Sequence, residues 1–153
     1  MFCQGVPVSA ISEEQKVAIV ENCDMIRDNL KNVQRIDART RTFLGSHFET
    51  ILSKFIMPLN MRLLENNLSD VDLIENQNEL AAAKAVFGES FISYQQELEN
   101  LVLMNCKTEP ERFYEKLEIV REKRKVVNTN VAKMKELVAK NLSLVIKLKE
   151  GTK

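Results

Sequence analysis

Few residues in this chain combine a reactive side chain with a spacing that could form a site. His47 is the only histidine, and no second histidine or cluster of cysteines completes a transition-metal site around it. Nucleophilic catalysis would need a nucleophile, a base and an orienting acid, and no spacing supplies this set. We therefore expect no enzymatic activity, no metal and no cofactor. We interpret His47 as a residue at a helix seam or at the edge of the core.

Basic residues are the second group of interest, because clustered guanidinium and ammonium groups bind phosphates and acidic polymers. They form two stretches, which consist of Arg35, Arg39 and Arg41, and of Arg121, Lys123, Arg124 and Lys125. The whole chain, however, balances 22 Lys and Arg against 22 Asp and Glu. Because this balance provides no net positive field, we expect no nucleic-acid partner.

The composition favours a helical protein of one domain. The 153 residues include 4 Gly, 3 Pro and no Trp, and few breakers and few aromatic residues favour long helices over sheets. Hydrophobic residues make up 44% and charged residues 29%, which is typical of a folded chain. No apolar run approaches the roughly 18 residues of a membrane span, so we expect no transmembrane segment.

Capping residues indicate where the helices begin. Ser12 and Gln15 form a capping box, in which each side chain bonds to the backbone of the other residue. Ser69 precedes acidic residues that favour the positive end of a helix. Thr108 stands three residues before Glu111, with a proline between them in the first turn. The sequence therefore predicts three helix starts.

The predicted fold is all-α, with three long antiparallel helices in a coiled-coil-like bundle over residues 12–150. The helices are expected over residues 13–65, 70–104 and 109–149. The linkers between them are so short that successive helices must be antiparallel neighbours. Pro58 lies inside the first helix and removes one backbone hydrogen bond, which predicts a kink or break.

Apolar residues recur every three or four positions, which is typical of a coiled-coil seam. The third helix has the longest row: Phe113, Leu117, Val120, Arg124, Val127, Val131, Met134, Val138, Asn141, Val145 and Leu148. The second helix has Leu73, Leu80, Phe87, Phe91, Tyr94, Leu98 and Leu101. The widest apolar face lies in the first helix, from Phe43 to Leu63, and predicts contact with more than one neighbour or with another subunit.

Two polar residues interrupt the row of the third helix. Arg124 needs a partner at a seam, and Asp37 and Glu97 lie at its height in the predicted bundle. Asn141 is the second polar residue. Both are predicted to fix the register of the helices, as buried asparagine does in coiled coils.

The two basic stretches lie at about the same height in the predicted bundle, together with several acidic residues. We expect the charges to form a neutral, interlaced surface. The alternative is a patch that contacts an anionic surface or polymer through Arg35, Arg39, Arg41, Arg121 and Lys125.

The bundle also brings two cysteines to a similar height. If the first turn centres near residues 66–68, Cys106 lies level with about residue 28, close to Cys23. A disulfide is feasible if their Cα atoms come within about 7 Å. The alternative is two reduced thiols, one buried and one exposed.

Residues 1–11 are interpreted as a disordered tail or as the remnant of a signal peptide. Val8-Ser9-Ala10 has the small residues of a cleavage site, whereas the basic and most of the apolar parts of a signal are absent. The first interpretation predicts a cytoplasmic protein, and the second predicts an exported one.

Several segments resemble small helical proteins of candidate-phylum, reduced-genome bacteria, a group with no assigned function. The segments are Arg39–Ser46, Ile51–Ile56, Pro58–Asn60, Phe113–Leu117 and Arg121–Lys125. The resemblance covers most of the chain from about Cys23 onward. It implies export behind a signal peptide, a location at the cell envelope or exterior, and a disulfide between Cys23 and Cys106. This chain departs from the group in lacking a full signal peptide.

The sequence favours a non-enzymatic structural or interaction module that presents helical faces to a protein partner or to a second copy of itself. The first alternative is a weak binder of anionic surfaces through the basic stretches. The second is a small-ligand carrier with a cavity in the bundle core near His47, Phe48 and Phe55.

Overall fold

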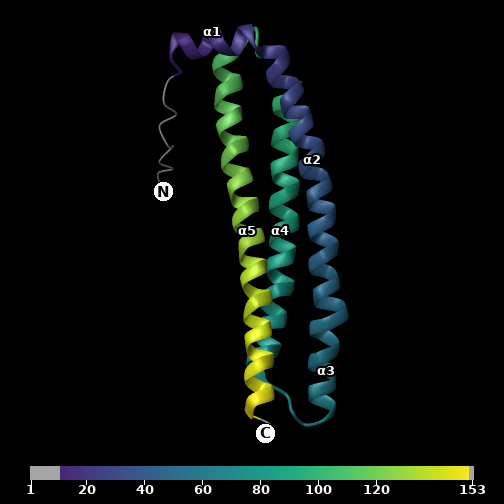
Figure 1. The fold of residues 1–153 in the computed structure, drawn as a ribbon. Coiled ribbons are helices and arrows are strands. Elements are labelled where there is room, and N and C mark those ends of the chain that lie inside the picture. Colours follow the sequence, from purple (N-terminus) through teal and green to yellow (C-terminus); the bar gives the residue numbers. More distant parts are fainter. Residues whose placement is uncertain (1–10, 152–153) are drawn as a thin grey trace, which may run out of the picture.

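The computed structural model describes residues 11–151, and this range is all-helical, as predicted (Figure 1). Its elements are α1 (Glu13–Glu21), α2 (Cys23–Thr50), the π-helical segment η1 (Ile51–Ile56), α3 (Met57–Glu65), α4 (Val71–Leu103) and α5 (Pro110–Gly151). α2, η1 and α3 form one continuous arm, α4 returns beside it, and α5 runs back along α4. Residues 1–10 of the predicted tail lie outside the described residues, whereas Ile11 packs against the core.

The prediction of a single first helix over residues 13–65 is wrong, because the chain turns at Asn22. The backbone N–H and the side-chain amide of Asn22 both donate to the carbonyl of Ala18, at 3.1 and 2.9 Å. The backbone bond is the ordinary i→i−4 bond of a helix, whereas the side-chain bond to the same carbonyl favours an end of the helix at this residue. α1 therefore crosses one end of the molecule (Figure 1), where Lys16 pairs with Glu111 of α5 at 2.5 Å.

Pro58 is accommodated by a π-helical segment directly before it. The N–H of Met57 donates to the carbonyl of Leu52, five residues back in the chain. This wider turn adapts the hydrogen-bond ladder to the bond that Pro58 cannot donate. Pro58 then lies in the first turn of α3, where a missing N–H is tolerated. The kink or break expected at Pro58 therefore takes the form of a π-helical segment.

The capping box of Ser12 and Gln15 is confirmed, but the predicted cap of α4 is wrong. Asp70, rather than Ser69, caps this helix, and its carboxylate accepts the N–H of Leu73 at 3.0 Å. A carboxylate is favoured at this place because it meets the positive end of the helix dipole.

The predicted cap of α5 also differs from the structure. The helix begins at Pro110, and the hydroxyl of Thr108 donates to the carbonyl of Asn105. The carboxylate of Glu111 forms an ion pair with Lys16 of α1.

α4 and α5 form the most extensively packed pair of helices. All seven residues of the row predicted for the second helix are buried in α4. In α5 the buried residues are Phe113, Val120, Val127, Met134, Leu137 and Asn141. The alternate members of the predicted row, such as Leu117, Val131 and Val138, are only partly buried. The reason is that the α2–η1–α3 arm packs mainly on α4 and leaves one side of α5 uncovered.

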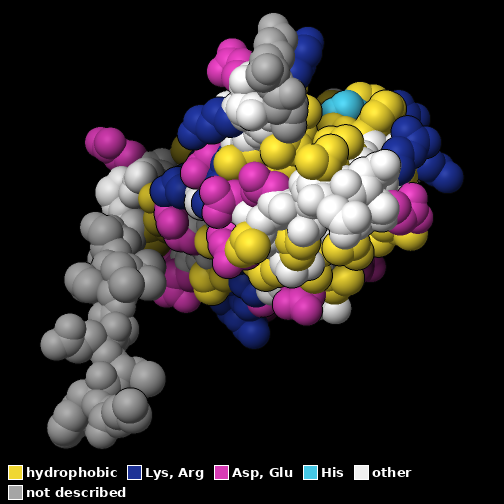
Figure 2. Space-filling model, turned by 90° about the horizontal axis from the view of Figure 1, so that it is seen from below, with side chains coloured by type: hydrophobic (Ala, Val, Ile, Leu, Met, Phe, Trp, Pro, Cys, Tyr) yellow, Lys and Arg dark blue, Asp and Glu magenta, His cyan; other side chains and the backbone are white. Residues whose placement is uncertain are grey.

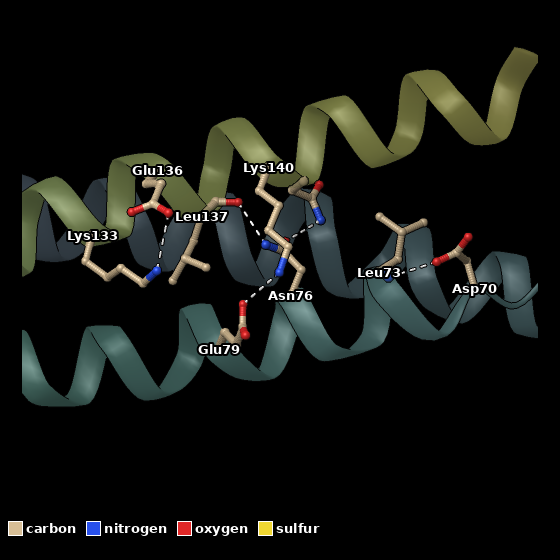
Figure 3. A network of polar contacts seen from close by, with 9 residues as sticks. Asp70, Leu73, Asn76, Glu79, Lys133, Glu136, Leu137 and Lys140 are labelled. Atoms are coloured by element: carbon tan, nitrogen blue, oxygen red, sulfur yellow. Dashed lines mark hydrogen bonds and ion pairs between the residues drawn. The ribbon is translucent and has the colours of Figure 1, made fainter.

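A buried amide network joins α4 to α5 (Figure 3). The amide of Asn76, which is 0% exposed, donates to the Leu137 carbonyl at 3.0 Å. Asn141 donates in turn to the side-chain oxygen of Asn76 at 2.9 Å. Lys140 and Glu79 form an ion pair beside this network at 3.1 Å (Figure 3). Polar groups buried in a seam are satisfied in only one register, so the network disfavours sliding of the two helices.

We predict that Asn76 and Asn141 are energetically coupled. Asn141→Leu leaves the side-chain oxygen of Asn76 buried without a donor, which is expected to cost about 1–3 kcal/mol of unfolding free energy. Asn76→Leu combined with Asn141→Leu removes both polar groups, so the double variant should lose less than the two single losses together. Urea unfolding of the four proteins measures the coupling, and strictly additive losses would contradict it.

Candidate functional site

A polar triad lies where α2, α4 and α5 meet, and it consists of Asp37, Tyr94 and Arg124. The Tyr94 hydroxyl donates to the Asp37 carboxylate at 2.6 Å. Arg124 donates to the same carboxylate through Nε at 3.0 Å and through Nη2 at 2.9 Å. Of the two acids expected at the height of Arg124, Asp37 is the one that it contacts, whereas Glu97 pairs with Lys116 at 3.1 Å. The Arg–carboxylate fork is the strong, directional form of such a pair.

Burial and charge fix the protonation of the triad. Tyr94 is 1% exposed. Burial of its phenol, together with the hydrogen bond to Asp37, raises the pKa of Tyr94 above its ordinary value of 10.0. The hydrogen bond to Asp37 likewise raises the pKa of Arg124. Near neutral pH the triad therefore holds a neutral phenol and a charged guanidinium, both donating to one carboxylate.

A cavity of about 300 Å³ lies beside the triad, between the same three helices. Its apolar lining is Ile36, Leu44, Phe87, Phe91, Val127 and Val131, and its polar lining is the triad with Thr40, Arg41 and Asn128. The guanidinium carbon of Arg41 lies 5.2 Å from the centre of the Phe91 ring, which is a cation–π contact. Nothing in the sequence pattern located this cavity, because its lining comes from three separate helices.

Of the basic residues singled out in the sequence, Arg41 and Arg124 line this cavity and the others do not. Arg35 donates to Asn32, Arg121 pairs with Glu118, and Lys125 pairs with Glu122, each within its own helix. Arg39 is exposed, whereas Arg41, two residues later, lines the cavity. The two predicted stretches therefore separate into Arg41 and Arg124, which line the cavity, and groups that do not, among them Lys123, which donates to Ser93 of α4.

The aromatic residues around His47 do not form an interior ligand site. Phe48 is 2% exposed and belongs to the core, whereas Phe55 is 65% exposed. His47 is exposed as well, and its ring stacks on Phe43 with 5.9 Å between the centroids. These three side chains, around which the alternative of a small-ligand carrier placed its cavity, do not face a common interior space.

A disulfide joins Cys23 to Cys106, with 5.6 Å between their Cα atoms. Both residues are buried, and the bond ties the start of α2 to the linker between α4 and α5. Beside it, Lys107 pairs with Asp24 at 2.6 Å, so a charged contact spans the same junction. The structure thus agrees with the disulfide interpretation rather than with two free thiols.

Other kinds of site can be judged within residues 11–151. In this range no group of three His, Cys, Asp or Glu side chains is placed to hold a metal ion. The helices of the described part are all too short or too polar to cross a membrane. Comparisons with protein-family models, with curated proteins and with solved structures give no match for the chain.

We predict that the disulfide contributes substantially to stability. Reduction, or Cys23→Ala with Cys106→Ala, is expected to lower the unfolding free energy by up to about 4–5 kcal/mol, because the bond spans 83 positions of sequence. Urea unfolding with and without reductant measures this loss. Cys3→Ser keeps both bridging cysteines and is the control. Unfolding that is unchanged by reduction would contradict the prediction.

We also predict that Tyr94 makes stability depend on alkaline pH. A raised pKa in the folded state means that the stabilisation is complete below pH 10 and is lost as the pH rises through the folded pKa. Above pH 10, the unfolding free energy of Tyr94→Phe should therefore fall less steeply with rising pH than that of the wild type. Tyr114→Phe keeps the triad and serves as the control. Urea unfolding at a series of alkaline pH values tests this, and parallel profiles for wild type and Tyr94→Phe would count against it.

Proposed function

We propose that the protein is a non-enzymatic helical module that binds another protein, or a second copy of itself, through one end of the molecule. The observation that carries this proposal is the difference between the two ends. The end at α1 is closed by that helix, by the disulfide and by the ion pairs of Lys16 and Lys107. The opposite end has no such cover among the described residues.

The opposite end, which we term the open end, exposes large apolar side chains from three parts of the chain. They are Met61 and Leu64 of α3, Leu68 and Val71 at the α3–α4 turn, and Leu142 and Ile146 of α5. Figure 2 looks at the molecule from this end and shows many hydrophobic side chains on its surface. Grouped apolar side chains of this size mark interaction surfaces in soluble chains.

Burial of the exposed apolar side chains favours association through the open end. Met61 and Leu64 are each 62% exposed, and Val71 is 69% exposed. Full burial of one such side chain stabilises a complex by roughly 1.5–3 kcal/mol. Several buried together can offset the loss of translational and rotational freedom on binding.

We further propose a coiled-coil-like bundle of three long antiparallel helices as the scaffold, with α2, η1 and α3 together acting as the first helix. The rows of apolar residues at three- and four-residue spacing support this description. The proposed location is the cell envelope or exterior. The disulfide supports it, because such bonds persist in oxidising compartments, and so does the resemblance to exported bacterial helical proteins.

The open end can be tested by placing charge on it. The double variant Met61→Glu/Leu64→Glu is expected to lose the ability to self-associate, because a carboxylate is costly to bury. Sedimentation of wild type and variant over a range of concentrations measures this. Val126→Glu changes a side chain that is 53% exposed elsewhere on α5, and it should leave the mass unchanged. Circular dichroism confirms that the variants fold.

A different protein partner is tested by photo-crosslinking in extracts of the native host. A photoreactive residue at position 64 should capture a discrete partner or a second copy, whereas one at position 126 should not. The proposal would be overturned if the wild type is monomeric and the photoreactive residues at positions 64 and 126 give equal crosslinks or none.

A further inference from the structure

The cavity between α2, α4 and α5 has an unbalanced charge. The charged residues that line it are Asp37, Arg41 and Arg124. Asp37 and Arg124 neutralise each other through their paired hydrogen bonds. Arg41 forms no ion pair with any residue of the described range, so the lining carries one uncompensated positive charge.

The guanidinium of Arg41 lines the cavity and has N–H donors available for an anion. Its Cζ atom lies over the ring of Phe91, 5.2 Å from the ring centre, which is a cation–π contact. Among residues 11–151, no side chain or carbonyl accepts a hydrogen bond from this guanidinium. Arg41 is also only partly exposed, so water screens it less than a surface arginine.

The remainder of the lining is apolar and aromatic. Phe87, Phe91, Val127 and Val131 contribute apolar side chains to this lining. A volume of about 300 Å³ lies at the lower limit of pockets that hold small organic ligands. Inorganic phosphate would satisfy Arg41 but would leave this apolar wall in contact with water. The lining therefore fits a ligand that has one anionic group and an apolar body.

We infer that this cavity binds a small organic monocarboxylate with an apolar body. The carboxylate pairs with the N–H edge of Arg41, and the body packs against Phe87, Phe91 and Val131. Asp37 and Tyr94 hold Arg124 in place, so this second guanidinium forms part of the wall and remains paired. The site lies midway along the helices and is separate from the open end, so it does not depend on the proposed association.

Calorimetric titration with octanoate tests the site. We expect saturable binding at one site per chain, and Arg41→Gln should weaken it roughly tenfold or more, because a hydrogen bond to a charged group is lost. Arg39→Gln is the matched control, since it removes an exposed arginine two residues earlier on the same helix and should leave the affinity unchanged. Octanol, which has the same chain but no charge, should bind at least tenfold more weakly than octanoate by the same reasoning.

A second variant keeps the test decisive if Arg41→Gln disturbs the fold. Val131→Trp places a large ring in the cavity and should abolish octanoate binding while circular dichroism and the open-end sedimentation behaviour stay the same. The inference is overturned if the wild type does not bind octanoate, or if octanol binds equally well. It is also overturned if Arg39→Gln and Arg41→Gln weaken binding alike, which would mean general charge attraction.

Discussion

The covalent bond between Cys23 and Cys106 sets the height of α2 against the other two long helices. Asp37 and Arg124 lie the same number of residues along α2 and α5, counted from Cys23 and from the start of α5. Because helices rise by a constant amount per residue, an anchor at one end brings this carboxylate and guanidinium level with each other. The triad and the cavity beside it are therefore consequences of where the chain is tethered.

The cavity and the half-exposed row of α5 have one common cause. The α2–η1–α3 arm packs mainly on α4, and among the described residues its hydrogen bonds and ion pair with α5 are those between Asp37 and Arg124. Below the triad, Asn60 ties the arm to α4 by donating to the Leu73 carbonyl and to Gln77. Side chains of α5 that would be buried in a closed bundle remain partly exposed, and the space between the helices is not filled.

Much of the fold could be predicted because it follows from local spacing. The row from Leu73 to Leu101 and the capping box of Ser12 required only helical periodicity and capping chemistry. The partner of Asn141 was missed, although its signal was present: the row skips from Leu73 to Leu80, and Asn76 fills the gap. The turn at Asn22 was missed, although its hydrogen bonds to Ala18 are local. The cavity at Arg41 could not be predicted, because its lining comes from three separate helices.

The π-helical segment has a consequence for the phase of the arm. The residues that bury against the core around it, Phe48, Leu52, Ile56 and Asn60, recur every four positions. In a regular α-helix a four-residue repeat drifts around the axis by about 40° per step. In the wider turn of η1, each residue rotates the chain about the helix axis by a smaller angle, which cancels part of this drift. η1 thus sets the rotational phase of α3: if residues 51–56 formed a regular α-helix instead, α3 would be rotated and Asn60 would turn away from α4, even though the sequence of α3 stayed the same.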